Sequence, residues 1–148
     1  MGEKRFKKLS HSLWECKYHL VFCPKYRYRI LGGEVGRYVD RNIYQLLSQK
    51  EMVTVLECHV QPDHVHLVVE IPPKYSVSDI MGFLKGKLAL KLFKQYPHFG
   101  RQYWGRHVWS RGYCVSTVGI DEAKIREYVR WQEEKEREEE EQQGRLFN

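Results

Sequence analysis

Two histidines, His64 and His66, stand two residues apart in a stretch rich in apolar and β-branched residues. We expect this stretch to form a strand, in which residues i and i+2 project from the same face. Both imidazoles would then lie on one side and Val65 on the other, and two neutral imidazoles so placed can bind one divalent cation. A solvent-facing strand with two incidental histidines is the other interpretation, because motifs this short often arise by chance.

Tyr128 and Gln132 form a second candidate pair. A spacing of four places them on one face of a helix, about one turn apart. A tyrosine beside an amide that can bind a cation could form the other half of a site. Tyr128 could equally be an ordinary core aromatic with Gln132 on a solvated flank, and helical spacing does not distinguish the two interpretations.

The elements that must position these residues follow from the periodicity of the sequence. Runs of apolar and aromatic residues bounded by Pro, Gly or Asp predict strands, and apolar residues at helical spacing predict helices. Ser76, with Asp79 three residues later, resembles a capping box at a helix start. In chain order we expect strand 12–24, helix 35–47, strand 53–60, strand 64–71, helix 76–96, strand 113–118 and a last helix from about 121.

The order β-α-β-β-α-β-α predicts an α+β fold. Its first six elements match a ferredoxin-like, split β-α-β-β-α-β antiparallel sheet with helices packed on one face, followed by a C-terminal helix that carries the tyrosine. With 148 residues we expect one domain, 1–148, with an acidic C-terminal tail at about 133–148. This fold serves RNA-binding modules, small-molecule sensors and nucleases, so it does not decide the function.

Composition argues against several classes of protein. Hydrophobic residues make up 42% and aromatic residues 14%, which is outside the range of disordered chains. No apolar run approaches the roughly 20 residues needed to span a membrane, and the basic arm at 4–8 lacks the apolar region of a signal peptide. We therefore expect a cytoplasmic protein with no membrane partner. No two cysteines form a C-x-x-C pair, so we interpret all four as small buried thiols: Cys16, Cys23, Cys58 and Cys114.

Charge is unevenly distributed along the chain. The net charge is +6, but residues 133–148 hold seven glutamates against three basic residues, which leaves +10 on residues 1–132. A body this basic favours a polyanionic partner, because each neutralised phosphate releases counterions. For the acidic tail, a solvated helix end, a brake on non-specific DNA binding and a disordered segment all stay open.

Three basic clusters, two of them interleaved with aromatic residues, favour single-stranded nucleic acid. Each cluster alone resembles an ordinary solvated face, so it is their combination in one small domain that carries weight. The candidate DNA-binding residues are Lys25, Arg27, Arg29, Lys85, Lys87, Lys91, Arg106 and Arg111.

Four blocks of sequence occur in a characteristic order: YHLVFCPKYR at 18–27, PDHVHL at 62–67, VSTVG at 115–119 and YVRWQ at 128–132. Together they resemble the single-tyrosine HUH transposases of the insertion-sequence 200/605 family, which act on single-stranded DNA. The blocks are distributed over most of the chain between residues 12 and 132, and their combination is far more specific than any one of them. The glutamate-rich tail lies outside the resemblance.

The resemblance implies a role for each candidate residue. His64 and His66 would bind the metal, Gln132 would be the third protein ligand, and Tyr128 would be the nucleophile. The cofactor would be one Mg²⁺ or Mn²⁺ ion per site, and two imidazole ligands favour Mn²⁺.

The implied reaction is the cleavage and rejoining of single-stranded DNA at element ends that bear hairpins. Tyr128 would attack phosphorus and leave a 3′-hydroxyl and a 5′-phosphotyrosine, a step that another 3′-hydroxyl can reverse. The family also implies a homodimer, in which a mobile tyrosine helix often completes the partner's site. Whether Tyr128 acts in its own subunit stays open, and Gly119 suits a hinge as well as a plain turn.

Three alternatives share parts of this pattern. A non-catalytic nucleic-acid-binding module on the same fold would bind DNA without metal and without the Tyr128 hydroxyl. A domesticated enzyme acting on repeated palindromes, or a replication-type nicking enzyme, would share the chemistry but not the mobile element. A metal-dependent hydrolase would use an activated water and form no covalent adduct.

Overall fold

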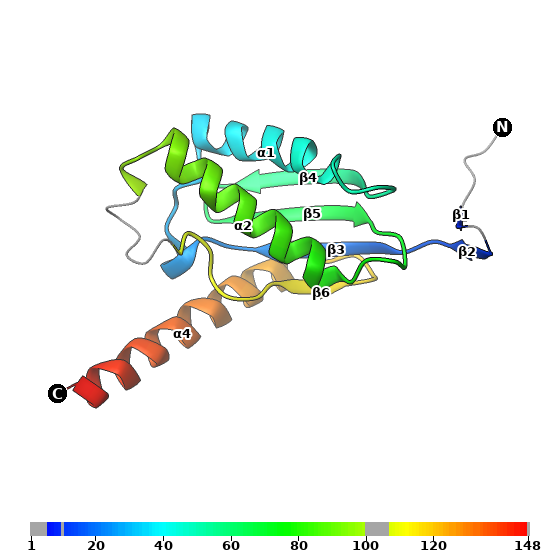
Figure 1. Cartoon of the computed structure of the whole chain (residues 1–148). Helices are drawn as coiled ribbons and strands as arrows, with labels where there is room; N and C mark the ends of the chain where they lie inside the picture. The colour runs from blue at the N-terminus through cyan, green and yellow to red at the C-terminus, as the bar shows by residue number, and fades with distance from the viewer. Residues whose placement is uncertain (1–5, 10, 100–106, 148) are drawn as a thin grey trace.

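The computed structural model describes residues 6–9, 11–99 and 107–147. A four-stranded antiparallel sheet in the order β4-β5-β3-β6 forms its centre (Figure 1). Its strands are β3 (Lys17–Phe22), β4 (Thr54–Gln61), β5 (His64–Glu70) and β6 (Cys114–Ser116). The helices are α1 (Gly33–Leu47), α2 (Val77–Gln95) and α4 (Glu122–Phe147), with a 3-10 turn, η1, at Lys25–Arg27. This order and pairing confirm the predicted ferredoxin-like α+β fold.

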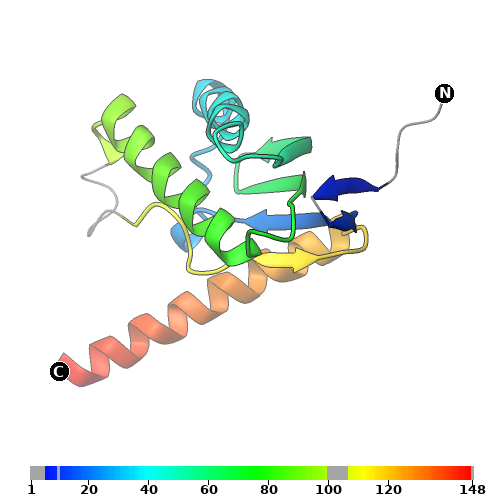
Figure 2. The same ribbon diagram turned by 45° about the vertical axis from the view of Figure 1, so that its right-hand side comes forward.

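Helices α1 and α2 cover one face of the sheet (Figures 1 and 2). Alternate residues of each strand point to that face, because successive side chains of a strand point to opposite sides. Leu20 of β3 and Leu67 of β5 are fully buried there, against Ile43 of α1 and Leu84 of α2. The main hydrophobic core therefore lies between the sheet and these two helices, as the sequence pattern predicts.

Helix α4 lies on the opposite face of the sheet, beneath β3 and β6 (Figure 2). Its contact with the sheet is a small apolar cluster in which Ile125 and Val129 pack on Val21, with Tyr128 and Cys114 at the margin. The helix continues without interruption through the glutamate-rich residues to Phe147, so the acidic tail is helical, and most of it is exposed.

The predicted strand over 12–24 is two strands, which is a correction to the sequence pattern. Its first part, β2 (Ser12–Trp14), pairs with β1 (Lys7–Leu9) in a separate two-stranded ribbon, and only β3 joins the main sheet. The break falls at Glu15 and Cys16, where the Cys16 carbonyl accepts a hydrogen bond from the N–H of Ile71. One apolar run thus serves two sheets, and its periodicity does not reveal the break.

Other local expectations hold. Ser76 caps α2, because its hydroxyl accepts a hydrogen bond from the N–H of Asp79 at 3.0 Å, and the helix ends before Pro97. Of the four cysteines, all of them free thiols, only Cys23 is buried and the other three are partly exposed, so the expectation of buried thiols is right for Cys23 alone. None of the helices in the described ranges has the length and apolar content that a membrane crossing requires.

Candidate active site

The histidine pair lies on the face of the sheet that α4 covers. Val65 and Leu67 of β5 point into the core beneath α1 and α2, so His64 and His66 project to the other side. His66 is paired with Val21 on one neighbouring strand and with His59 on the other. The predicted same-face geometry of the two imidazoles is therefore present.

His64 is held by the residue that precedes it. Its Nδ1 lies 2.9 Å from Asp63 Oδ1, so the ring donates its Nδ1 proton to the carboxylate. Burial pushes the pKa of Asp63 upward, but the hydrogen bond from His64 and the nearby charges of His64 and Arg29 outweigh it, and the pKa lies below its usual value. Asp63 is therefore an ionised acceptor, and Nε2 is the nitrogen of His64 that this bond leaves for another partner.

His66 sits among other imidazoles. Its Nε2 lies 3.4 Å from His19 Nδ1, and its ring centroid lies 6.0 Å from that of His59. Burial lowers the pKa of His66, and the neighbouring His19, His59 and His64 lower it further. A neutral imidazole is the form that can bind metal, and this environment favours the neutral form of His66.

A pocket of about 470 Å³ opens in front of the two histidines. Its walls come from the β4–β5 end of the sheet and from the first turns of α4, which contribute Glu122 and Arg126. Arg29 also lines it, and Arg29 Nη1 lies 4.0 Å from Asp63 Oδ2. Two guanidinium groups beside two imidazoles suit the binding of a phosphodiester.

Tyr128 and Gln132 form a contact with each other on α4. Gln132 Nε2 donates to Tyr128 Oη at 2.8 Å and to the carbonyl of Arg111 at 2.9 Å, and Gln132 is only 5% exposed. Burial raises the pKa of Tyr128 well above its usual value, although the bond from Gln132 works in the opposite direction. In this arrangement Tyr128 is a protonated phenol, which is a weak nucleophile.

The structure does not bring the two pairs together within one chain. Among the described residues, no hydrogen bond joins Tyr128 or Gln132 to either histidine. The part of α4 that faces His64 carries Arg126 and Arg130 instead, next to the apolar Ile125 and Val129. Joining the two halves requires α4 to move, or a second copy of the chain.

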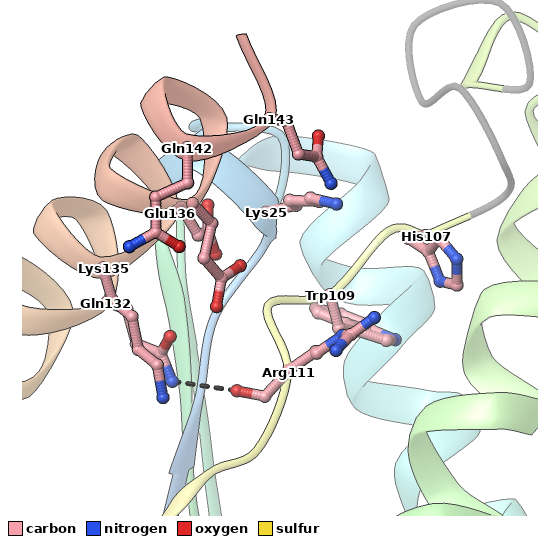
Figure 3. Close-up of a pocket in the computed structure, with 10 residues that line it drawn as sticks. Lys25, His107, Trp109, Arg111, Gln132, Lys135, Glu136, Gln142 and Gln143 are labelled. Carbon is pink, nitrogen blue, oxygen red and sulfur yellow. Dashed lines mark hydrogen bonds between the residues drawn. The ribbon is translucent and has the colours of Figure 1, made fainter. Parts of the chain in front are cut away.

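A buried carboxylate fastens α4 in this position. Glu136 lies eight residues after Tyr128 on the same helix stripe and is 7% exposed. It accepts hydrogen bonds from the Ser110 hydroxyl and from the N–H of Tyr26 in η1. Figure 3 shows Gln132 and Glu136 pointing from α4 toward the segment that carries Trp109 and Arg111, across a pocket of about 400 Å³.

The predicted donor set fits a divalent cation in part. His64 presents a free Nε2, His66 is kept neutral, and both lie on one face, so two of the three predicted ligands suit a metal. Gln132 is bound elsewhere, and among the described residues no three His, Cys, Asp or Glu side chains lie close enough to hold a metal by themselves. A third protein ligand would therefore have to be an amide or a residue outside the described ranges.

The predicted DNA-binding residues fall on two sides of the molecule. Lys25 and Arg111 line the pocket beside Glu136, and Arg29 lines the one beside His64. Lys87 and Lys91 lie on α2, across the sheet from the histidines. Arg27 lies in η1, and Arg106 lies outside the described residues.

Lys85 has a structural environment. Its ammonium donates to the carbonyls of Ser110 and Gly112 at 2.8 and 2.7 Å, and its own carbonyl accepts from the indole N–H of Trp109. Burial lowers its pKa to about 8. These bonds fix the segment at 110–112, which binds Gln132 and Glu136. A DNA contact by Lys85 stays a prediction.

Sequence reasoning missed Asp63, His19, His59, Arg126 and Glu136 as parts of the site. Asp63 and Arg126 stand one and two residues from predicted site residues, so proximity was an available signal. His19 and His59 are brought beside His66 by strand pairing alone. Glu136 stands within a run of glutamates, where no pattern marks one carboxylate as buried.

Comparison with known proteins agrees with this geometry. The family model described as "Transposase IS200 like" matches residues 12–132. This chain belongs to the IS200-like transposase family. The transposase for insertion sequence element IS200 of Salmonella typhimurium is 44% identical over 137 residues, which cover 93% of this chain and 88% of the relative. The ISDra2 transposase TnpA of Deinococcus radiodurans is 34% identical over 131 residues, covering 88% and 93%.

Solved structures place the fold in the same family. A Deinococcus radiodurans R1 protein described as a transposase superposes with a TM-score of 0.76 at 29% identity, covering 85% of this IS200-like chain and 97% of its own. A REP-associated tyrosine transposase bound to a REP hairpin superposes with a TM-score of 0.50 at 12% identity, covering 87% and 68%. At that identity the second likeness concerns the fold alone.

Proposed function

We propose that this IS200-like transposase cleaves and rejoins single-stranded DNA with Tyr128 as its nucleophile, in a site where His64, His66 and Gln132 hold one Mg²⁺ or Mn²⁺ ion. The observation that carries the proposal is the placement of two same-face imidazoles, one with its Nε2 left free by Asp63, on the sheet face that the Tyr128 helix covers. The bound ion would polarise the scissile phosphate and offset the charge that develops on it.

The chain's own residues account for the remaining steps. The Tyr128 oxygen forms a bond to phosphorus, and the bond between phosphorus and the 3′-oxygen breaks. The phenol proton is lost, the departing 3′-oxygen takes up a proton, and the products are a 3′-hydroxyl and a 5′-phosphotyrosine. Arg29 and Arg126 line the pocket beside the histidines, where they suit the phosphodiester's negative charge.

The active form is a homodimer in this proposal. Tyr128 and Gln132 are bound to their own subunit on the flank of α4 away from His64, so a second copy offers the most direct partner site. Mixing two inactive variants tests this. Tyr128→Phe and His64→Ala together would form adduct if the tyrosine serves the partner's histidines, and they would stay inactive together if each chain used its own pair.

The substrate in this proposal is single-stranded DNA that carries a hairpin at each element end. Two observations support this substrate class: the relatives include a transposase of an insertion sequence element, and one structural neighbour is bound to a REP hairpin. The basic, aromatic cluster at Lys25 and Tyr26 and the cation at Arg111 lie on the same side of the sheet as α4.

A covalent-trap assay tests the central step. Single-stranded oligonucleotides from the gene's flanks, with Mn²⁺ or Mg²⁺, should give an adduct that survives a denaturing gel. Tyr128→Phe and chelator should each abolish it, while Tyr44→Phe, an exposed tyrosine on α1, should leave it intact. DNA binding without an adduct on any flank and in either metal would favour a non-catalytic binding module.

A further inference from the structure

The two histidines of β5 are held by different kinds of neighbour. His64 donates its Nδ1 proton to a carboxylate, Asp63, whereas the Nε2 of His66 faces the imidazole of His19. A carboxylate accepts a hydrogen bond more strongly than a neutral ring does. The orientation of His64 is therefore the better determined of the two, and Asp63 determines it.

Asp63 is itself well fixed. It lies in the tight turn between β4 and β5, and its side chain is 12% exposed. One oxygen accepts from His64, and the other lies 4.0 Å from Arg29 Nη1. Because a buried carboxylate needs partners of this kind, both the place and the charge of Asp63 are determined by the fold.

The bond to Asp63 decides which nitrogen of His64 can bind a cation. A neutral imidazole carries one proton, so a proton held on Nδ1 leaves the lone pair on Nε2. Nδ1 is turned toward Asp63, and His64 lines the pocket that His66 also lines. In metalloproteins such a carboxylate fixes the tautomer and the orientation of the ligating ring and makes it more basic.

We propose that Asp63 is a positioning residue for this site, which sets the tautomer and the direction of the His64 ring before any cation binds. The role of His64 as a metal ligand rests on the proposed function, but its tautomer does not. Asp63 touches neither DNA nor cation in this role and acts only through His64.

The same sheet face offers a matched control. His59 on β4 lies 3.3 Å from the carboxylate of Glu57, which is the same pairing of residue types. Both of those side chains are more than half exposed, so water competes for that bond. Glu57→Gln removes a carboxylate beside a histidine without touching His64.

The first measurement is the ¹⁵N NMR spectrum of the histidine rings in the metal-free protein. The wild type and Glu57→Gln should show His64 protonated at Nδ1 with a free Nε2. Asp63→Ala should show a mixture of tautomers at His64. Asp63→Asn keeps an oxygen acceptor of similar size, so it should restore the Nδ1 form in part. This second variant keeps the test usable if Asp63→Ala disturbs folding.

The second measurement is Mn²⁺ binding without DNA, followed by electron paramagnetic resonance. Loss of such a carboxylate typically weakens metal binding by about 10–100-fold, which is the result expected for Asp63→Ala and not for Glu57→Gln. A wild-type His64 protonated at Nε2, or equal Mn²⁺ affinity in wild type and Asp63→Ala, would overturn the inference. A wild type that binds no Mn²⁺ but shows the expected tautomers would instead count against the proposed metal site.

Discussion

The histidine half and the tyrosine half of this site are built in opposite ways. His64 and His66 belong to a strand paired on both sides, with core residues between them. Tyr128 and Gln132 belong to a helix that touches the sheet through a small apolar cluster, and bonds from Gln132 and Glu136 also hold it.

This difference places a rigid part and a more easily displaced part within the proposed active site. Moving the histidines would require breaking the sheet and the core beneath it, whereas moving the tyrosine requires giving up a few contacts at the surface of one helix. A site that must first bind DNA and later release a joined product benefits from such a division. The comparison predicts that variants of the β5 histidines act on chemistry and that variants of the contacts that anchor α4 act on position.

The largest effect is expected when a histidine of β5 is removed. His64→Ala or His66→Ala should lower the rate of adduct formation by more than about 100-fold, because a lost ligand costs more than a lost outer partner. Thermal stability should change little, since both side chains are partly exposed. The measurement is the adduct rate at saturating Mn²⁺, with His11→Ala, which removes an exposed histidine just before β2, as control. An equal loss of adduct rate in all three variants would show that the effect is not specific to the two histidines of β5.

A smaller effect is expected when the anchor of α4 is weakened. Glu136→Gln leaves one buried donor, Ser110 or the N–H of Tyr26, without a good acceptor, so we expect a loss of about 1–3 kcal/mol in unfolding free energy. Glu139 lines the same pocket but is exposed, so Glu139→Gln should lower the unfolding free energy much less. Denaturant unfolding measures both. Amide exchange in α4 should also accelerate in Glu136→Gln alone, and equal behaviour of the two variants would show that Glu136 is no anchor.

A pH effect is expected at Lys85, which fixes the segment that receives Gln132. Burial lowers its pKa to about 8, whereas an unfolded lysine titrates near about 10.4. Between these values the unfolded chain binds more protons than the folded chain, so the unfolding free energy should rise with pH across that window and stay level below it. Unfolding of wild type and Lys85→Met should be compared from pH 7 to 10. A slope that persists in Lys85→Met would assign it to another group.

The smallest effect is expected at Gly119. A Cβ added there would meet open space, and its backbone is not in the left-handed region, so Gly119→Ala should change stability by less than about 0.5 kcal/mol. If Gly119 serves as a hinge for α4, the adduct rate should fall while stability stays the same. An unchanged rate would identify a plain turn.

The sequence was a good guide where one element determines the geometry. The same-face placement of His64 and His66 needs only the period of a strand, and the contact between Tyr128 and Gln132 needs only the period of a helix. Ser76 capped its helix for the same local reason. The order of elements was enough for the ferredoxin-like sheet because few topologies satisfy it.

The sequence was a poor guide where separate elements meet. Neither the grouping of His19 and His59 around His66 nor the burial of Glu136 follows from local spacing, because each depends on strand pairing or helix docking. For the same reason the sequence does not reveal that the ammonium of Lys85 is bound to two backbone carbonyls. The sequence of a helix shows how many cationic side chains it carries, but not which of them are already bound to other groups of the protein.

The length of α4 has a consequence for how the proposed nucleophile, Tyr128, could reach the histidines. An α-helix rises about 1.5 Å per residue, so Tyr128 lies only about 9 Å from the start of a lever arm about 39 Å long. A swing of about 10° at the Gly119 end would carry the far end by about 7 Å but Tyr128 by less than about 2 Å. Rocking is therefore an inefficient way to reach the histidines. Rotation of the helix about its own axis, or its exchange between subunits, would move the phenol much farther for the same disturbance of the sheet.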